Sequence, residues 1–307
     1  MSVDLPARIG MGVVNVGLVL ALAPLAEGIL RKVTARIQSR QGPPLLQPYY
    51  DLLKLLGKED LETGAAPRLQ RFAACLALAS ILAVALLVPM GGGPPLAGGA
   101  DAILLVYLLT LGGVASLLAA LAAGSTYSLM GMSREMMAMM TLEPVLAVAV
   151  LTGAVHAGSL RLDRVLDGSV YATGVFPWTG LMLLGVALGS LQAFVGRLPF
   201  DVAEAETEIM EGPLVEYAGP KLALFKYAQM AKVVAYSALV IALFCPWGTG
   251  TYGVDLVLFL AKVLVLVLVV TLVAATHARY RIDQAVRYYA GLLAVSFAAL
   301  ALAVWGY

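Results

Sequence analysis

Six carboxylates are concentrated in the 20 residues from Arg197 to Glu216, directly after an apolar stretch of the chain. They are Asp201, Glu204, Glu206, Glu208, Glu211 and Glu216, about a third of the 19 acidic residues in the sequence. In a continuous helix, four of them from Asp201 to Glu211 would fall at i, i+3, i+7 and i+10, on one face. Like charges in that arrangement repel one another and should titrate as a coupled set. Such a row at a membrane border suits the handling of protons or cations.

A purely structural interpretation explains part of this cluster. Asp201 and Glu204 have the spacing of a capping box, and acidic residues suit the first turn of any helix. That accounts for two or three of the six carboxylates. Because no Lys or Arg stands between Arg197 and Lys221, the pattern as a whole favours a functional role.

The composition predicts an all-α integral membrane protein. Hydrophobic residues make up 61% of the chain, charged residues only 13%, and the mean hydropathy is +0.90. Apolar runs of roughly 20 residues can cross a bilayer as helices. We expect about eight of them in a single transmembrane domain covering residues 1–307, near 9–30, 69–90, 101–123, 136–158, 177–197, 225–246, 253–276 and 288–306.

The basic residues predict the orientation of the bundle. Most Lys and Arg residues fall in loops at about 31–68, 124–135, 198–224 and 277–287, whereas the opposite side carries Arg8, Arg161 and Arg164. Positively charged loops tend to stay in the cytoplasm, so these loops are expected inside and both termini outside.

Ionisable residues within the apolar runs are costly and normally face a cavity or a partner. Glu143 lies in the fourth run and Lys262 in the seventh. We predict a relay from Glu143 to the acidic cluster, with Lys262 as its counter-charge. Glu27 and Lys232 lie nearer the ends of their runs, and we expect both to reach the membrane interface.

The first charged loop should contain a surface helix. Gly42-Pro43-Pro44 forces a turn, and the stretch from Leu45 to Lys58 then repeats apolar residues at helical spacing. This amphipathic segment could lie on the membrane surface or beneath a soluble partner, and both interpretations stay open.

No catalytic motif or metal-binding pattern is evident. The two cysteines, Cys75 and Cys245, lie in different apolar runs, and we predict no metal, cofactor or nucleic-acid site in this chain.

Several motifs resemble the eight-span subunit 1/H family. They are Ala35-Arg-Ile-Gln-Ser-Arg-Gln-Gly-Pro43, Lys54-Leu-Leu-Gly-Lys-Glu59, Arg197-Leu-Pro-Phe-Asp201, Glu216-Tyr-Ala218 and Ala278-Arg-Tyr-Arg-Ile-Asp-Gln284. That family includes the complex I subunit that forms much of the quinone cavity and the membrane anchor of group 4 energy-converting [NiFe]-hydrogenases, including formate hydrogenlyase. The direct step from Gly42-Pro-Pro44 to Leu45-Leu-Gln-Pro48 is closer to the hydrogenase form. Leu30 stands where complex I relatives carry a glutamate, so a role for Glu27 is in doubt.

The resemblance implies a membrane anchor and ion-coupling subunit in a prokaryotic cell membrane, the inner membrane where there are two. It implies that Glu143, Glu204, Glu206 and Glu211 belong to an acidic channel beneath the redox module, with Asp201 and Glu208 at its mouth. It assigns the docking of a soluble arm to Arg36, Arg40, Arg197, Arg279, Arg281 and Asp283. The implied partners are hydrogenase-like large and small subunits, a ferredoxin-like iron–sulfur subunit and antiporter-like membrane subunits, with the NiFe centre and iron–sulfur clusters on those partners. The alternatives are a quinone-site subunit of a complex I-type NADH:quinone oxidoreductase, an independent ion transporter and a purely structural anchor.

Overall fold

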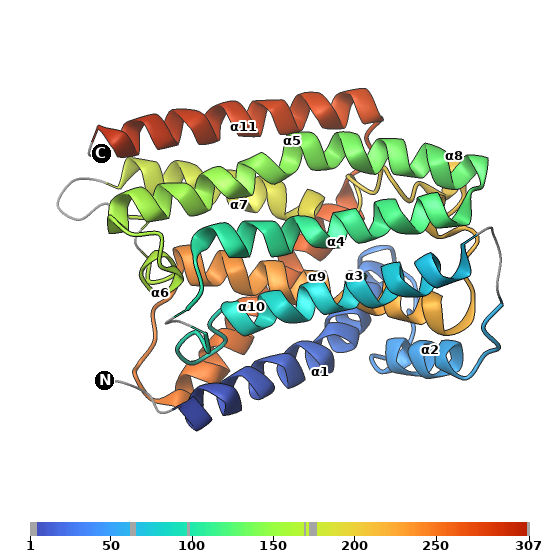
Figure 1. Ribbon diagram of the computed structural model, residues 1–307, viewed down its shortest axis with the longest axis horizontal. Helices are drawn as coiled ribbons and strands as arrows, with labels where there is room; N and C mark the ends of the chain where they lie inside the picture. Colours follow the sequence, from blue (N-terminus) through green and yellow to red (C-terminus); the bar gives the residue numbers. More distant parts are fainter. Residues whose placement is uncertain (1–4, 62–65, 97–98, 169, 172–176, 306–307) are drawn as a thin grey trace.

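The computed structural model describes residues 5–61, 66–96, 99–168, 170–171 and 177–305. Eight long helices run roughly side by side and form one bundle (Figure 1). They are α1 (Leu5–Ile37), α3 (Pro67–Leu87), α4 (Ala102–Ala123), α5 (Thr126–Ala157), α7 (Trp178–Phe194), α9 (Gly219–Phe244), α10 (Tyr252–Thr276) and α11 (Ile282–Val304). No strand occurs in the described ranges beyond an isolated bridge between Asp101 and Arg161, which confirms the all-α prediction.

Seven of the described helices are long and apolar enough to cross a membrane, and α7 is a shorter apolar helix of 17 residues. Seventeen residues is the lower end of what can span a bilayer. The prediction of about eight spans is therefore confirmed as seven long helices and one short one. The chain is a multi-pass membrane protein.

The short elements and the termini distinguish the two ends of the bundle. The short elements are α2 (Gln47–Leu56), α6 (Leu162–Val165), α8 (Glu206–Ile209) and the 3₁₀ turn η1 (Gly212–Leu214). Figure 1 shows α2 and α8 at one end and both termini at the other. We call these the loop end and the terminal end.

Local sequence signals set most helix boundaries. Proline occupies the first turn of α2, α3 and α9, where its missing N–H costs nothing. Gly124 ends α4 with φ of 69°, and the Ser125 hydroxyl accepts a hydrogen bond from the Ser128 amide at 3.2 Å. The loop predicted at 124–135 is therefore a tight turn, and α5 begins at Thr126 rather than near residue 136.

Helix α9 is the centre of the bundle. In its most apolar 18-residue window, 83% of the residues are buried, against 22–44% in the other six long spans. It packs against α1, α3, α7 and α10, and it also contacts α2. A polar side chain on α9 is therefore far more constrained than one on the peripheral α10 or α11.

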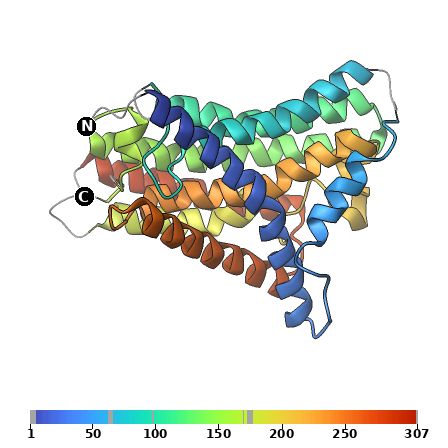
Figure 2. The ribbon, with the colours of Figure 1, turned by 90° about the horizontal axis from the view of Figure 1, so that it is seen from below.

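The predicted surface helix is α2, which runs obliquely to the long helices (Figure 2). A Cβ atom on Gly28 would lie 2.0 Å from the Leu45 carbonyl oxygen, so only glycine lets the chain before α2 cross α1 so closely. Pro48 and Leu52 of α2 are buried, whereas Leu46, Leu53 and Leu56 are exposed. These leucines thus face away from the bundle, where lipid or a partner could cover them, whereas the Tyr49 hydroxyl donates to the Ala21 carbonyl oxygen of α1.

Candidate ion-coupling site

The acidic segment is not one helix. Residues 195–205 form an irregular connection, α8 has only four residues, and η1 follows after Met210 and Glu211. The predicted row of carboxylates on one helical face is therefore wrong. The side chain of Glu206, at the start of α8, lies outside the described residues.

Three of the carboxylates instead pair with basic side chains from distant parts of the chain. Asp201 Oδ2 lies 2.8 Å from Arg279 Nη2, and Glu208 is paired with Arg134 of α5. Glu211 Oε1 lies 3.6 Å from Lys226 Nζ of α9. Ion pairs with cations from other elements thus compensate these three charges, while the expected repulsion persists between Asp201 and Glu204.

Aromatic packing holds the start of the segment in place. The Phe200 ring contacts Tyr280, Tyr288 and Tyr289, with centroid distances of 5.3, 5.0 and 5.4 Å. The Tyr280 amide donates to the Pro199 carbonyl oxygen at 3.0 Å. The position of Asp201 is consequently fixed by the segment that leads into α11.

A buried ion network joins the same segment to α1 and α2. Glu27 is only 3% exposed, and its carboxylate binds Arg31 Nε at 3.0 Å and also pairs with Arg197. Arg31 in turn lies 3.0 Å from Asp51 of α2. The prediction that Glu27 reaches the interface is wrong, because two arginines compensate its charge inside the protein.

A cavity of about 800 Å³ opens between these elements and contains both signs of charge. Its wall carries five acidic and six basic side chains. The acidic ones are Glu27, Glu135, Asp201, Glu204 and Glu211. Glu135 was not singled out from the sequence, although it lies eight residues before Glu143 in α5 and could have been noticed as a second acidic residue of that helix.

Glu204 is a carboxylate of the segment whose proton affinity is strongly changed by its surroundings. The Gln229 side-chain amide of α9 donates a hydrogen bond to Glu204 Oε1. Burial, the largest cause, and the neighbouring charges of Asp201 and Glu135 together raise the pKa of Glu204 to about 7, against smaller lowering effects of Lys232 and Arg197. Glu204 can therefore exchange a proton near neutral pH.

The raised pKa of Glu204 predicts a pH-dependent stability. The folded protein holds this proton more tightly than the unfolded chain, so the contribution is complete below the ordinary value of 4.5 and is lost as the pH rises through about 7. As the pH rises from 4.5 to about 7, we expect the thermal midpoint of the wild type to decrease relative to that of Glu204→Gln. Parallel pH profiles of the two proteins in detergent would contradict this.

Glu143 and Lys262 do not lie together as predicted. Lys262 Nζ donates to the carbonyl oxygens of Cys245 and Trp247, both at 2.8 Å, just after α9 at the terminal end. Glu143 lies instead within electrostatic reach of Glu135 and Lys232. The structure thus provides Lys232, not Lys262, as the counter-charge, and Lys232 lines the cavity rather than reaching the interface.

The remaining predicted residues divide into exposed and internal groups. Arg36, Arg40, Arg281 and Asp283 are exposed, as docking residues should be. In contrast, Arg197 and Arg279 make the internal ion pairs described above. Glu216 is half-buried beyond η1 and is not among the described residues that line the cavity.

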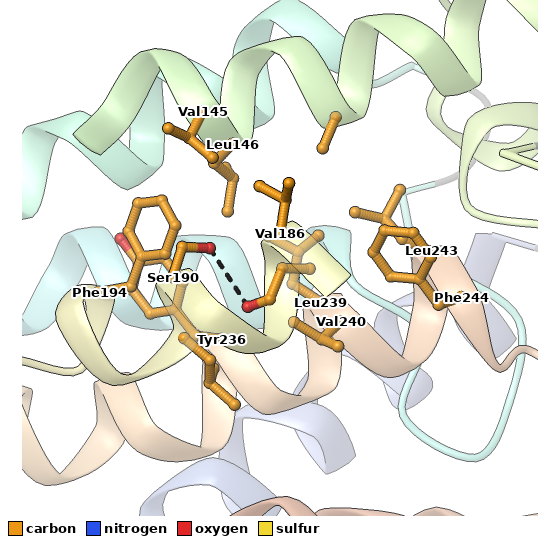
Figure 3. A pocket seen from close by; sticks show the side chains of 13 residues that line it. Val145, Leu146, Val186, Ser190, Phe194, Tyr236, Leu239, Val240, Leu243 and Phe244 are labelled. Atoms are coloured by element: carbon orange, nitrogen blue, oxygen red, sulfur yellow. Dashed lines mark hydrogen bonds between the residues drawn. The ribbon is translucent and has the colours of Figure 1, made fainter. Parts of the chain in front are cut away.

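A second, small void of about 20 Å³ lies between α5, α7 and α9, on the terminal side of Glu143 (Figure 3). Its wall is almost entirely aliphatic and aromatic, and the hydroxyl of Ser190 already donates to the Ala187 carbonyl oxygen at 3.2 Å. A buried water needs two to four polar partners, so this void should stay dry. The packing between these three helices is therefore apolar at this level.

The described residues contain no group of three or more His, Cys, Asp or Glu side chains that could hold a metal ion. Cys75 and Cys245 are both free; Cys75 lies within α3 and Cys245 directly follows α9. The chemistry that the described side chains offer is therefore that of protonation and ion pairing.

Comparison with known proteins extends over almost the whole chain. A family model described as NADH dehydrogenase matches residues 9–304. Hydrogenase-4 component C of Escherichia coli (strain K12) is 34% identical over 295 residues, which are 94% of this chain and 93% of that protein. Formate hydrogenlyase subunit 4 of the same organism is 34% identical over 272 residues, or 86% and 88% of the two chains.

More distant relatives include an NADH-quinone oxidoreductase subunit of Anaplasma phagocytophilum (strain HZ), 31% identical over 310 residues, with 91% of this chain and 90% of that protein covered. Among solved structures, a chain of the membrane-bound sulfane sulfur reductase, an archaeal respiratory membrane complex, superposes with a TM-score of 0.85. The two chains are 25% identical, and the superposition covers 97% of this chain and 99% of the other.

Proposed function

Because this chain belongs to the NADH dehydrogenase family, we propose that it is the membrane anchor and ion-coupling subunit of an energy-converting hydrogenase-type complex. Its relatives belong to respiratory membrane complexes, and this chain is likewise a membrane subunit of such a complex. The ion-coupling role is supported by the charged cavity, which connects the loop end to titratable groups within the bundle.

In this proposal the loop end is cytoplasmic and carries the soluble arm. Hydrogenase-like large and small subunits and a ferredoxin-like subunit would dock on the exposed charges Arg36, Arg40, Arg281 and Asp283. The NiFe centre and the iron–sulfur clusters would belong to those partners. Antiporter-like subunits would lie beside this chain in the membrane, and both termini would be outside.

The ion pairs suggest how a redox event at the loop end would reach the cavity. A shift of the docked arm would move α2 or the first charged loop, and Asp51, Arg31 and Glu27 connect α2 to Arg197. Arg197 lies four residues before Asp201 and acts electrostatically on Glu204. A small displacement of this network would thus alter the proton affinity of Glu204.

The apolar void argues against a path through this chain alone. A proton on Glu204 or Glu143 would have to cross a dry wall of Val, Leu and Phe side chains to reach the terminal end. The charge change should therefore pass sideways to membrane partners. An independent ion transporter fits this arrangement poorly.

A quinone-site subunit is the second candidate. A cavity of about 800 Å³ is large enough for a small organic ligand, and one relative is an NADH-quinone oxidoreductase subunit. Quinone would then be the acceptor within the same fold.

The first experiment is to purify the intact complex through this subunit in mild detergent and measure its nickel and bound quinone. About one nickel per complex together with hydrogenase-like subunits is the result expected for the proposed function. An intact complex with bound quinone and no nickel would overturn it in favour of the second candidate.

A further inference from the structure

Lys232 is a charged side chain within the membrane-spanning part of the central helix α9. It lies in the cavity wall and makes no ion pair within 4.0 Å and no hydrogen bond among the described side chains. A cation in a membrane segment is costly unless something compensates its charge. The role of Lys232 should therefore depend on the groups that compensate its charge.

One face of α9 arranges those groups in order. Gln229, Lys232 and Tyr236 follow at i, i+3 and i+7, so their side chains succeed one another along the helix. Gln229 holds Glu204 through its hydrogen bond, and Tyr236 lies within electrostatic reach of Glu143. Along this face, Lys232 thus lies between Gln229, which binds Glu204, and Tyr236, which lies near Glu143.

Acidic side chains from two neighbouring elements act on this lysine, in a cavity wall that also contains cations such as Arg197 and Lys226. Helix α5 contributes Glu143, whose charge interacts with that of Lys232, and also Glu135, which lines the same cavity. The segment before α8 contributes Glu204, on which Asp201 and Arg197 also act. The small residues Ser80 of α3 and Gly112 of α4 lie beside it: a Cβ on Gly112 would lie 3.8 Å from Lys232 Cε and 3.3 Å from Ser80 Oγ.

We infer that Lys232 is a positioning cation that links the charge states of Glu204 and Glu143. One ammonium group serves two carboxylates on different elements, so it can compensate only one fully at a time. This inference rests on the proposed function and names the residue through which the cavity and the interior of α5 would be coupled.

The proton balance of this exchange is simple. When Glu204 gives its proton to cavity water, the new carboxylate attracts the ammonium, which keeps all three of its protons. Glu143 then loses its compensation and takes up one proton from water at the membrane partners. One proton leaves the cavity side and one enters α5, with no net change in the charge of the three groups.

The test uses the intact complex and infrared difference spectroscopy of protonated carboxyl groups as a function of pH. The Glu204 band is assigned by its loss in Glu204→Gln. In Lys232→Met the titration midpoint of Glu204 should move upward by roughly one pH unit, because an attracting cation is removed. Lys232→Arg should restore a midpoint close to that of the wild type.

Lys262→Met is the matched control, since it removes a second lysine from a spanning helix. Its ammonium donates to the carbonyls of Cys245 and Trp247 and lies near Asp255, so the variant should lose thermal stability without a shift of the Glu204 midpoint. If Lys232→Met does not assemble, Lys232→Gln is measured in the same way.

An unchanged midpoint in Lys232→Met, or no titrating Glu204 band in the wild type, would overturn the inference even if the complex pumps ions. Absence of nickel or of coupled ion movement would instead count against the proposed function. The two failures are therefore distinguishable.

Discussion

Glu143→Gln is expected to abolish most of the ion movement coupled to redox turnover while leaving the turnover itself largely intact. Glu143 lies inside α5, directly before Pro144, among the charges of Glu135 and Lys232. Glutamine has nearly the same shape and can donate and accept hydrogen bonds, but it cannot bind or release a proton. Since a positioned acid or base typically contributes factors of 10² or more to proton transfer, a loss of roughly tenfold or greater is expected.

The measurement is made on the complex in proteoliposomes. A pH-sensitive dye follows ion movement, and gas or acceptor turnover is recorded in the same sample. Glu208→Gln provides the comparison: it removes a carboxylate from the acidic segment, but Glu208 is exposed and paired with Arg134 at the surface. Exposed ion pairs contribute roughly 0–1 kcal/mol. Glu208→Gln should therefore lose less ion movement than Glu143→Gln. Unchanged pumping in Glu143→Gln, or an equal loss in both variants, would contradict the assignment.

The fold could be predicted because a membrane simplifies the problem. Uninterrupted apolar runs of spanning length can only be helices there, and turn signals such as Gly124 and the proline-led helix starts divide them. The error at residues 124–135 arose because Ser125 caps α5 at once, and the polar residues that follow are part of a helix that extends beyond the apolar run.

The site could be predicted only in part. The segment from Arg197 to Glu216 and the intramembrane Glu143 stand out from the sequence by charge alone. Their partners do not, because Arg134 and Arg279 are brought to the acidic segment by tertiary packing. Three of the four carboxylates expected to repel one another are paired with cations for this reason, and only the repulsion between Asp201 and Glu204 remains among the four.

The sequence also did not indicate which of the two intramembrane lysines belongs to the site. Lys232 and Lys262 both interrupt apolar runs, and the two charges by themselves do not indicate which helix is central. Only the packing shows that α9 is central and that α10 is peripheral. A central helix directs its lysine into the charged cavity, while the peripheral helix uses its lysine to bind backbone carbonyls at a turn.

Glu27 shows that a departure from a familiar motif does not exclude a structural role. Leu30 occupies the position next to the Arg-Lys pair, yet Glu27 lies one helical turn earlier and so projects from the same face as Arg31. Its buried carboxylate then holds Arg197 against α1. The network therefore ties three segments together: α1, α2 through Asp51, and the connection that carries Asp201 and Glu204.

Glu27→Gln should consequently destabilise the protein by about 3 kcal/mol, because removing one partner of a buried ion pair leaves the others uncompensated. The expected readout is a clearly lower thermal midpoint of the subunit in detergent. Asp163→Asn is the matched control, since Asp163 pairs with Arg161 at 2.9 Å in an exposed position, where loss of the pair should change the thermal midpoint little. In a double-mutant cycle, adding Arg197→Gln to Glu27→Gln should cost much less than Arg197→Gln does alone. Strict additivity of the two substitutions would show that Glu27 and Arg197 are not coupled, and the link between α1 and the acidic segment would have to be abandoned.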